Sequence, residues 1–269
     1  MLFGQALKDM GVQVLATATN HSLDKNYDGL ERTLSLLDTL NISHVGTNRS
    51  QEEQDKIVIK NVRGINIAFL SYTYGSNVGI PDDRPYCLNI INRDKIVEDI
   101  KKAKEKKADF ICIDLHLGES KNTVPNNEQA ELQEFLLKNG ADIIIGSEPN
   151  VIQPIDQRLI TTVNTQEKGV VTAYSLGNFI AGYDGGDTNL SILLNIEITK
   201  EDHQCYISKI SYRPLYILDK KTQKNRFVVL DILDSINEYQ MKKAGAVDEE
   251  TYYKLIEALN KAKELTGIY

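Results

Sequence analysis

The sequence predicts an α/β fold, and two observations support this assignment. From residue 12 to about residue 180, short apolar segments that are typical of buried strands alternate with longer segments that have the spacing of amphipathic helices. After residue 180 the pattern changes to alternating apolar and polar residues, which is typical of antiparallel strands. Strands that alternate with helices are the pattern of a sheet that carries helices on its faces.

The first part of the chain contains one well-defined helix between two short strands. After a helical start, residues 11–16 are expected to form a buried strand, and residues 42–46 form another. An apolar stripe at the three-and-four spacing predicts a helix over 28–40. The stripe consists of Leu30, Thr33, Leu34, Leu37 and Leu40. Asp28 is the expected N-cap, and Glu31 follows three residues later as in a capping box.

The central part of the chain continues the alternation. Residues 56–62 and 65–72 are two apolar runs around a short polar turn, which predicts a hairpin. Residues 74–86 carry two glycines and two prolines and are expected to form a long loop, and loops of this length are often functional. A helix is predicted over 92–107 and a buried strand over 109–116.

The same reasoning assigns the remaining elements in order. They are a helix over 127–139, a strand over 142–146, a strand over 169–179, an antiparallel pair over 189–199 and 205–216, and a helix over 248–265. Gly140 follows the first of these helices at the position where a C-terminal glycine is common. The basic segment 219–226 is expected to be a solvated loop.

Composition and charge narrow the class of function. The 269 residues carry 31 Lys and Arg against 38 Asp and Glu, and a net charge of −7 argues against a nucleic-acid-binding protein. No apolar run approaches the roughly 20 residues of a membrane-spanning helix, and the N-terminus lacks the features of a signal peptide. We expect Cys87, Cys112 and Cys205 to be buried thiols, with a Cys87–Cys205 disulfide as the alternative.

Polar side chains follow four of the predicted strands at the point where each strand ends. The clusters occupy residues 19–24, 116–119, 146–150 and 176–179. Ligands of open α/β sheets bind beyond the carboxyl ends of the strands, so we expect these four clusters to converge. Their imidazole, carboxylate and carboxamide groups suit a divalent metal ion.

Each cluster also has a purely structural interpretation. The first could be a turn with a helix cap, the second could contain a core histidine, and the last two could be ordinary turns. His44 and His203 follow no predicted strand end, and we interpret both as structural or surface residues.

Six motifs, taken together in their order, are more specific than any single cluster. They are Ala18-Thr19-Asn20-His21-Ser22-Leu23-Asp24, Ser-Tyr-Thr-Tyr-Gly-Ser-Asn at 71–77, His-Leu-Gly-Glu at 116–119, Pro125 with Gln129, Ile-Gly-Ser-Glu-Pro-Asn-Val-Ile-Gln-Pro at 145–154 and Tyr-Ser-Leu-Gly-Asn-Phe at 174–179. In order and spacing they resemble the motifs of the CapA family, the poly-γ-glutamate capsule synthesis proteins. The resemblance covers about residues 5 to 215.

The resemblance implies a fold and a site. The family is related to calcineurin-like metallophosphoesterases, which implies a β-sandwich flanked by helices in four α/β/β/α layers. It implies that Asn20 and His116 are metal ligands and that His21 is a general acid for attack of metal-activated water on a phosphate ester. Glu148 and Asn150 would complete the metal ligands. Further binding residues are expected at Asp24, Tyr74, Asn77, Glu119 and Asn178.

The chain also departs from the family pattern. Glu148 and Asn150 replace the two histidines of a His-Pro-His motif, so the site would favour Mn²⁺, Mg²⁺ or Ca²⁺ over Zn²⁺, or would hold no metal. The opening strands of the family, with their acidic motifs, are absent. We therefore expect a homodimer, pairing with a missing N-terminal segment, or coverage of the gap by the chain's own C-terminal strands. On this interpretation, residues 1–218 are an incomplete CapA-like domain and 219–269 a C-terminal helical extension.

Three hypotheses about function follow. The first is a CapA-like protein of capsular poly-γ-glutamate or cell-envelope polymer synthesis or export, whose degenerate metal-site cleft binds polymer or a partner. The second is an active divalent-metal-dependent phosphoesterase, and the third is a non-catalytic envelope scaffold.

The expected partners are an acidic polymer or a phosphate-containing ligand and other capsule-synthesis proteins, with no nucleic acid. The resemblance implies the extracellular cell surface. Because the sequence shows no signal peptide or anchor, the cytoplasm stays an alternative.

Overall fold

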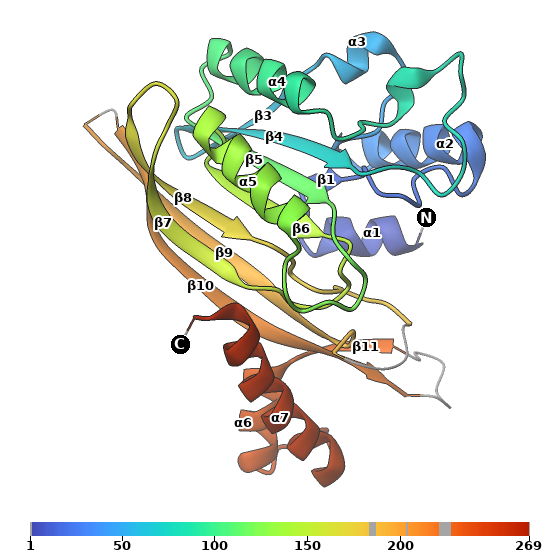
Figure 1. Ribbon diagram of the computed structural model, residues 1–269. Coiled ribbons are helices and arrows are strands. Elements are labelled where there is room, and N and C mark those ends of the chain that lie inside the picture. Colours follow the sequence, from blue (N-terminus) through green and yellow to red (C-terminus); the bar gives the residue numbers. More distant parts are fainter. Residues whose placement is uncertain (1, 183–186, 203, 221–226, 269) are drawn as a thin grey trace. The chain divides into compact units, whose positions relative to one another are not determined.

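The computed structural model describes residues 2–182, 187–202, 204–220 and 227–268, and it is a mixed α/β chain (Figure 1). In order, the elements are α1 (Leu2–Asp9), β1 (Val14–Ala16), α2 (Asn26–Thr39), β2 (Ser43–Val45), α3 (Gln51–Gln54), β3 (Val58–Val62), β4 (Ile65–Thr73), the 3₁₀ helix η1 (Pro85–Cys87), α4 (Arg93–Glu105), β5 (Phe110–His116), α5 (Asn127–Asn139), β6 (Ile143–Ser147), β7 (Ile155–Thr161), β8 (Glu167–Ala173), β9 (Leu190–Glu201), β10 (Gln204–Asp219), β11 (Phe227–Asp231), α6 (Ile232–Gln240) and α7 (Glu249–Thr266).

The chain forms two compact units that interleave along the sequence. Unit 1 consists of Met1–Leu117, Leu132–Ile144 and Ile160–Val170, and unit 2 consists of Gly118–Glu131, Ile145–Leu159 and Val171–Tyr269. The strands form a two-stranded sheet β1-β2, a three-stranded sheet β11-β10-β9 and a six-stranded sheet in the order β3-β4-β5-β6-β8-β7.

The core of unit 1 lies between strands of the six-stranded sheet and helices α4 and α5 (Figure 1). Ile96, Ile100 and Ala103 of α4 and Leu132, Leu136 and Leu137 of α5 are buried against Ile111, Ile113 and Leu115 of β5. Burial of each large aliphatic side chain stabilises the fold by about 1.5–3 kcal/mol. Strands β3 and β4 form the predicted antiparallel hairpin, and β4 runs parallel to β5 with Thr73 opposite His116.

A second apolar cluster in unit 1 surrounds helix α2. Leu30, Leu34 and Leu37 of the predicted stripe are buried in it. The helix begins at Asn26, so the predicted N-cap at Asp28 is wrong. The reason is local: residues 20–25 form turns that run into the helix, and the Gly29 amide already donates to the Lys25 carbonyl at 3.1 Å.

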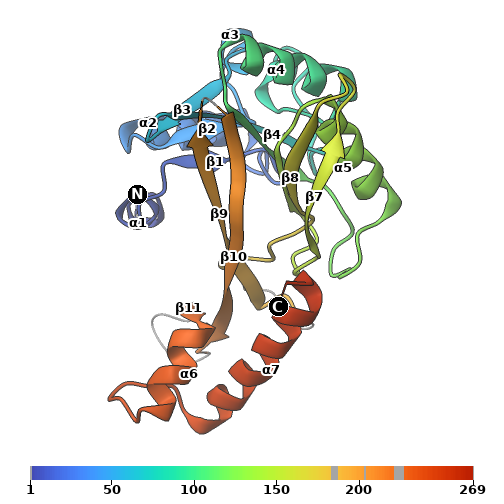
Figure 2. The ribbon, with the colours of Figure 1, turned by 90° about the vertical axis from the view of Figure 1, so that its left-hand side faces the viewer.

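Unit 2 contains the long antiparallel ribbon of β9 and β10, followed by β11 and the helix pair α6 and α7 (Figure 2). The ribbon confirms the prediction of an antiparallel pair. Helix α7 begins after Asp248, whose Oδ1 accepts a hydrogen bond from the Thr251 amide at 2.8 Å. It ends at Gly267, which has the left-handed φ of 69° that favours glycine.

Most sequence-predicted elements are present, and the differences have clear reasons. Helix 127–139 agrees at both ends, whereas the strand predicted over 169–179 ends at Ala173. Strand β7 was missed because half of its residues are polar and Leu159 is 75 % exposed. Strand β11 and helix α6 were missed as well. Most of the basic segment, residues 221–226, lies outside the described residues.

The cysteines and the membrane prediction can also be compared with the structure. All three cysteines are among the described residues, and no disulfide joins any of them. In the described part of the chain, no helix combines the length and the apolar character that crossing a membrane requires. The proposed boundary at residue 218 stays a prediction.

Candidate functional site

Two of the four strand-end clusters meet in unit 1. His116 ends β5, and its Nε2 donates a hydrogen bond to Asn20 Oδ1 at 3.0 Å. Asn20 Nδ2 in turn donates to Asn77 Oδ1 at 3.1 Å, and the Asn77 amide donates to the Asn20 carbonyl at 2.9 Å. Asn20 and His116 are both buried, at 7 % and 9 % exposure. These three residues form what we call the Asn20–Asn77–His116 network.

The turn after β1 positions Asn20. Ser22 Oγ accepts a hydrogen bond from the Thr19 amide at 2.8 Å and donates to the Thr17 carbonyl at 2.7 Å. Gly46 lies against Ala18 with a φ of 105°, and a Cβ there would lie 2.6 Å from the Ala18 Cβ. The site therefore requires a glycine directly after β2, a position that the sequence pattern marks only as the end of a strand.

His21 and Asp24 form a more exposed pair beside this network. His21 Nδ1 lies 2.7 Å from Asp24 Oδ2, and the two side chains are 59 % and 45 % exposed. Asn77 Nδ2 lies 3.4 and 3.5 Å from the two ring nitrogens of His21. A pair this exposed adds little to stability, but it orients the imidazole, whose ring is accessible to a ligand.

Tyr74 covers His116 from the loop that follows β4. The two rings are stacked, with centroids 6.2 Å apart and planes 11° from parallel. The Tyr74 amide also donates to the His116 carbonyl at 3.1 Å. The motif at 71–77 thus contributes both a hydrogen-bonding residue and an aromatic ring to the network.

Asp114 belongs to the same strand face and was not expected from the sequence. Ser71 Oγ donates to Asp114 Oδ2 at 2.8 Å. Burial raises the pKa of Asp114 to about 6, although the Ser71 hydrogen bond and the charge of His116 oppose this change. The available signal was its spacing, because residues two apart on a strand share a face, and Asp114 precedes His116 by two.

The donors gathered in unit 1 can be tested against a metal ion. Asn20 Oδ1 and His116 Nε2 are 3.0 Å apart, which is also the spacing of neighbouring ligands at about 2.1 Å from an octahedral ion. To bind such an ion, the imidazole of His116 would have to carry its proton on Nδ1 instead of Nε2. Two donors alone do not fit such an ion, which takes six. Within the described ranges, no group of three or more His, Cys, Asp and Glu side chains could hold a metal.

The other two clusters lie in unit 2, where carboxamides bind the backbone. Asn150 Nδ2 donates to the Glu148 carbonyl at 2.6 Å. Asn178 Nδ2 donates to the carbonyls of Asn150, at 3.2 Å, and Thr188, at 3.1 Å. Glu148 and Asn150 have φ values of 100° and 60°, which are strained for residues other than glycine. Asn178 thus joins the segments around residues 150 and 188 through its side chain.

Other motif residues of unit 2 also have structural contacts. Gln129 Nε2 donates to Gln153 Oε1 at 2.9 Å, and Gln153 Nε2 donates to the Asn122 carbonyl at 2.8 Å. Both glutamines are buried, so these hydrogen bonds satisfy groups that would otherwise be costly. Glu119 is exposed, and its Oε2 accepts from Asn122 Nδ2 at 3.3 Å.

The ten predicted site residues therefore divide between the units. Unit 1 contains Asn20, His21, Asp24, Tyr74, Asn77 and His116, and unit 2 contains Glu119, Glu148, Asn150 and Asn178. The first six form one connected group. Participation of Glu148 and Asn150 in a metal site with that group stays a prediction.

Comparison with solved structures gives one match that shows a shared fold and a weaker one. The 5'-nucleotidase precursor from Thermus thermophilus aligns with a TM-score of 0.51 and 13 % identity over 97 % of this chain and 45 % of that protein. The calcineurin-like phosphoesterase YfkN from Bacillus subtilis gives a TM-score of 0.46 and 13 % identity over 78 % of this chain and 65 % of that one. The predicted α/β class is confirmed, and the likeness to the nucleotidase concerns the fold alone.

Sequence comparison identifies the family to which this α/β protein belongs. Residues 3–183 match the family described as bacterial capsule synthesis protein PGA_cap. The capsule biosynthesis protein CapA of Bacillus anthracis is 31 % identical over 189 residues, and the PGA biosynthesis protein CapA of Bacillus subtilis (strain 168) is 32 % identical over 199 residues. The chain therefore belongs to the PGA_cap family, and the resemblance to CapA proteins is confirmed.

The alignments differ in how much of each protein they cover. They include 68 % and 73 % of this chain but 43 % and 50 % of the two relatives. The chain thus spans about half the length of the curated relatives that it matches.

Proposed function

We propose that this chain acts in the synthesis or export of capsular poly-γ-glutamate or another cell-envelope polymer, and that its cleft binds polymer or a partner protein. Family membership supports the capsule-related role. The observation that carries the binding role is the Asn20–Asn77–His116 network with the exposed His21 beside it. In this network the buried polar groups hydrogen-bond to one another, and the accessible imidazole faces the ligand.

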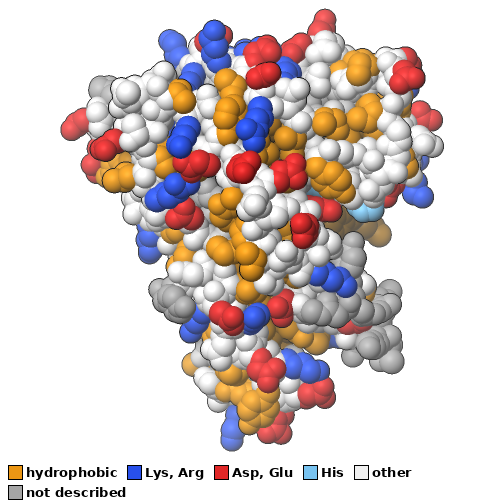
Figure 3. Space-filling model, viewed as in Figure 1, with side chains coloured by type: hydrophobic (Ala, Val, Ile, Leu, Met, Phe, Trp, Pro, Cys, Tyr) orange, Lys and Arg blue, Asp and Glu red, His pale blue; other side chains and the backbone are white. Residues whose placement is uncertain are grey.

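Charge supports a hydrogen-bonding or cation-bridged mode of binding. The chain carries a net charge of −7, and the face in Figure 3 shows acidic and basic side chains interspersed. Long-range attraction of an acidic polymer would need a predominantly basic surface. Contact through amide and imidazole groups, or through bridging cations, is consistent with this surface.

One observation favours a second candidate, a divalent-metal-dependent phosphoesterase. Asn20 Oδ1 and His116 Nε2 have the spacing of neighbouring metal ligands, and His21 is oriented by Asp24 as a proton-transferring group would be. This candidate needs more ligands than the network supplies. Mn²⁺, Mg²⁺ or Ca²⁺ is the proposed cofactor in that case, because oxygen ligands would have to complete the site.

Location and assembly are part of the same proposal. We infer a cell-envelope association from the capsule biosynthesis relatives. Other capsule-synthesis proteins are the proposed partners. A second copy of this chain or an N-terminal segment is proposed to pair with the small β1-β2 sheet, because among the described residues each of its two strands pairs only with the other.

The test combines polymer output in capsule-forming cells with hydrolysis of p-nitrophenyl phosphate in the presence of Mn²⁺. The variants are His21→Ala, His116→Ala and their combination, with Asn195→Ala on the exposed part of β9 as control. Polymer binding predicts that the double variant loses output while the unchanged protein shows no hydrolysis.

The other outcomes identify the alternatives. Hydrolysis that falls about 10²–10⁴-fold in His21→Ala would establish the phosphoesterase. Normal polymer output from the double variant would contradict both the polymer-binding role and the phosphoesterase role. It would favour a scaffold that needs the motifs only for folding.

A further inference from the structure

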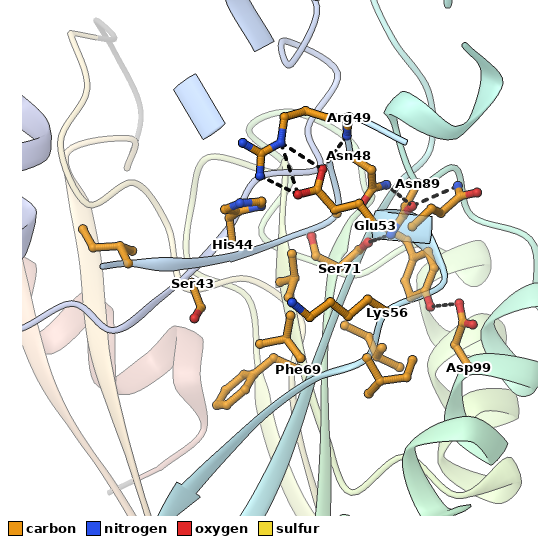
Figure 4. A pocket seen from close by; sticks show the side chains of 18 of the residues that line it. Ser43, His44, Asn48, Arg49, Glu53, Lys56, Phe69, Ser71, Asn89 and Asp99 are labelled. Carbon is orange, nitrogen blue, oxygen red and sulfur yellow. Dashed lines mark hydrogen bonds and ion pairs between the residues drawn. The ribbon is translucent and has the colours of Figure 1, made fainter. Parts of the chain in front are cut away.

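Unit 1 contains a cavity that lies apart from the strand-end network. Its volume is about 390 Å³, and its lining residues come from β2, β3, β4 and the segments around α3 (Figure 4). None of Asn20, His21, Asn77 and His116 lines it. Nothing in the proposed function uses this cavity, so its side chains require a separate explanation.

Most charged groups in the cavity are already paired with one another. Arg49 binds Glu53 and, through Nη1, Asp38 Oδ2 at 2.7 Å. His44, expected to be structural or a surface residue, has a side chain only 9 % exposed and lies 3.3 Å from Asp38. Asp99 accepts from the Tyr72 hydroxyl at 2.9 Å and pairs with Lys95. These contacts leave neither the arginine nor the carboxylates available to a ligand.

Lys56 is different. Among the described residues, no carboxylate lies within ion-pair distance of Lys56 or of Lys60, the other lysine of the lining. Figure 4 shows the ammonium end of Lys56 pointing into the space between Ser71 and Phe69. Lys60 is four residues further along the chain and lies within β3, whereas Lys56 precedes that strand. We expect a small ligand to contact only one of the two lysines.

Carboxamide groups line another part of the cavity. Asn48 Nδ2 donates to the Tyr86 carbonyl at 2.9 Å and to Asn89 Oδ1 at 3.0 Å. Gln54 Nε2 donates to the same Asn89 oxygen at 3.1 Å. The donors of these residues are therefore engaged, whereas no donor among the described residues reaches Asn48 Oδ1. This oxygen can accept a hydrogen bond from a neutral amide or hydroxyl.

We propose that this cavity binds a small monocarboxylate with a neutral amide or hydroxyl end. The carboxylate pairs with the Lys56 ammonium, the hydrocarbon part lies along Phe69 and Val58, and the neutral end donates to Asn48 Oδ1. A phosphate ligand fits less well, because Lys56 supplies a single point of charge, whereas two-pronged binding of a phosphate needs a free arginine. Here the arginine is held by Glu53 and Asp38.

Calorimetric titration of the whole chain with glutaramate, the monoamide of glutarate, tests the proposal. Lys56→Gln is expected to raise the Kd about tenfold, as for loss of one charge-assisted hydrogen bond. The matched control, Lys60→Gln, removes the same charge from the same cavity and should change the Kd by less than about threefold. Glutaramide, which is neutral and of nearly the same shape, should bind at least about tenfold more weakly than glutaramate.

Several results would overturn the proposal. They are absence of glutaramate binding to the unchanged protein, equal effects of the two lysine substitutions, and binding of inorganic phosphate in preference to glutaramate. None of Asn20, His21, Asn77 and His116 lines the cavity, so these results would not affect the proposed function. Loss of polymer output in the His21 and His116 variants would likewise say nothing about the cavity.

Discussion

The two units contain motifs of the same family, but the asparagines at their strand ends make different kinds of contact. In unit 1, Asn20, Asn77 and His116 hydrogen-bond side chain to side chain, and an exposed imidazole lies beside them. In unit 2, Asn150 and Asn178 bind backbone carbonyls and hold the loops around residues with positive φ. Contacts between side chains define a group that a ligand can meet, whereas contacts to the backbone fix a conformation.

Because of this difference, polar residues at strand ends can meet a ligand in unit 1 and fix a loop conformation in unit 2. Removing a carboxamide that holds a loop should lower the free energy of unfolding and leave the network in unit 1 intact. Removing a residue of that network should change ligand binding more than stability. The following substitutions test this comparison, from the largest expected effect to the smallest.

The largest effect is expected for Gly146→Ala near the end of β6. A Cβ at Gly146 would collide with the Tyr174 carbonyl oxygen, which is backbone and cannot move aside cheaply. We expect a loss of at least about 4 kcal/mol in the free energy of unfolding, or failure to fold. Gly169→Ala in β8 is the control, since no atom lies within 4 Å of its Cβ position. Equal urea unfolding midpoints for the two variants would contradict the prediction.

Asn178→Ala should have the next largest effect. The substitution leaves two carbonyls, those of Asn150 and Thr188, without their donor. We expect a loss of about 2–3 kcal/mol in the free energy of unfolding, measured in urea. Asn195→Ala, whose amide makes only a 3.4 Å contact with Ser211 Oγ, should cost less than about 0.5 kcal/mol.

The same variant tests whether the loops of unit 2 influence the network in unit 1. We expect the ring nitrogen signals of His116 in NMR spectra to be unchanged in Asn178→Ala. A large shift of these signals would show that the loops of unit 2 are coupled to the Asn20–Asn77–His116 network. The two units would then not have separate roles.

The smallest effect concerns Asp114 and depends on pH. Because burial raises its pKa from 3.8 to about 6, the folded state favours the protonated carboxyl. Its contribution to stability is therefore fully present below pH 3.8 and is lost as the pH rises through about 6.

Asp114→Asn should remove this pH dependence while keeping an acceptor for Ser71. At pH 7 we expect the variant to be about 1–2 kcal/mol more stable than the unchanged protein, allowing for partial solvent screening. At pH 4 the two should be nearly equal. Urea unfolding at both pH values measures the difference, and a difference that does not change with pH would refute the assignment.

Particular elements show how far the sequence could predict the fold. Helix 127–139 was predicted at both ends because its polar and apolar positions follow a helical period and a glycine follows it. The start of α2 was missed, since the turn at residues 20–25 depends on contacts rather than on a capping residue. Strand β7 was missed because its partly polar sequence has no clear two-residue period.

The sequence by itself determined the α/β class, the family and the identity of the polar residues at strand ends. Periodicity depends only on neighbouring residues, and the order of the motifs can be read directly along the chain. Only the tertiary structure decided what those residues contact. His116 meets Asn20 across 96 positions of sequence, and Asp114 meets Ser71 across 43. The cavity at Lys56 likewise combines residues between 38 and 99, most of which belong to none of the six motifs. Hydrogen-bond partners and burial depend on which strands become neighbours, and that is a property of the packed chain.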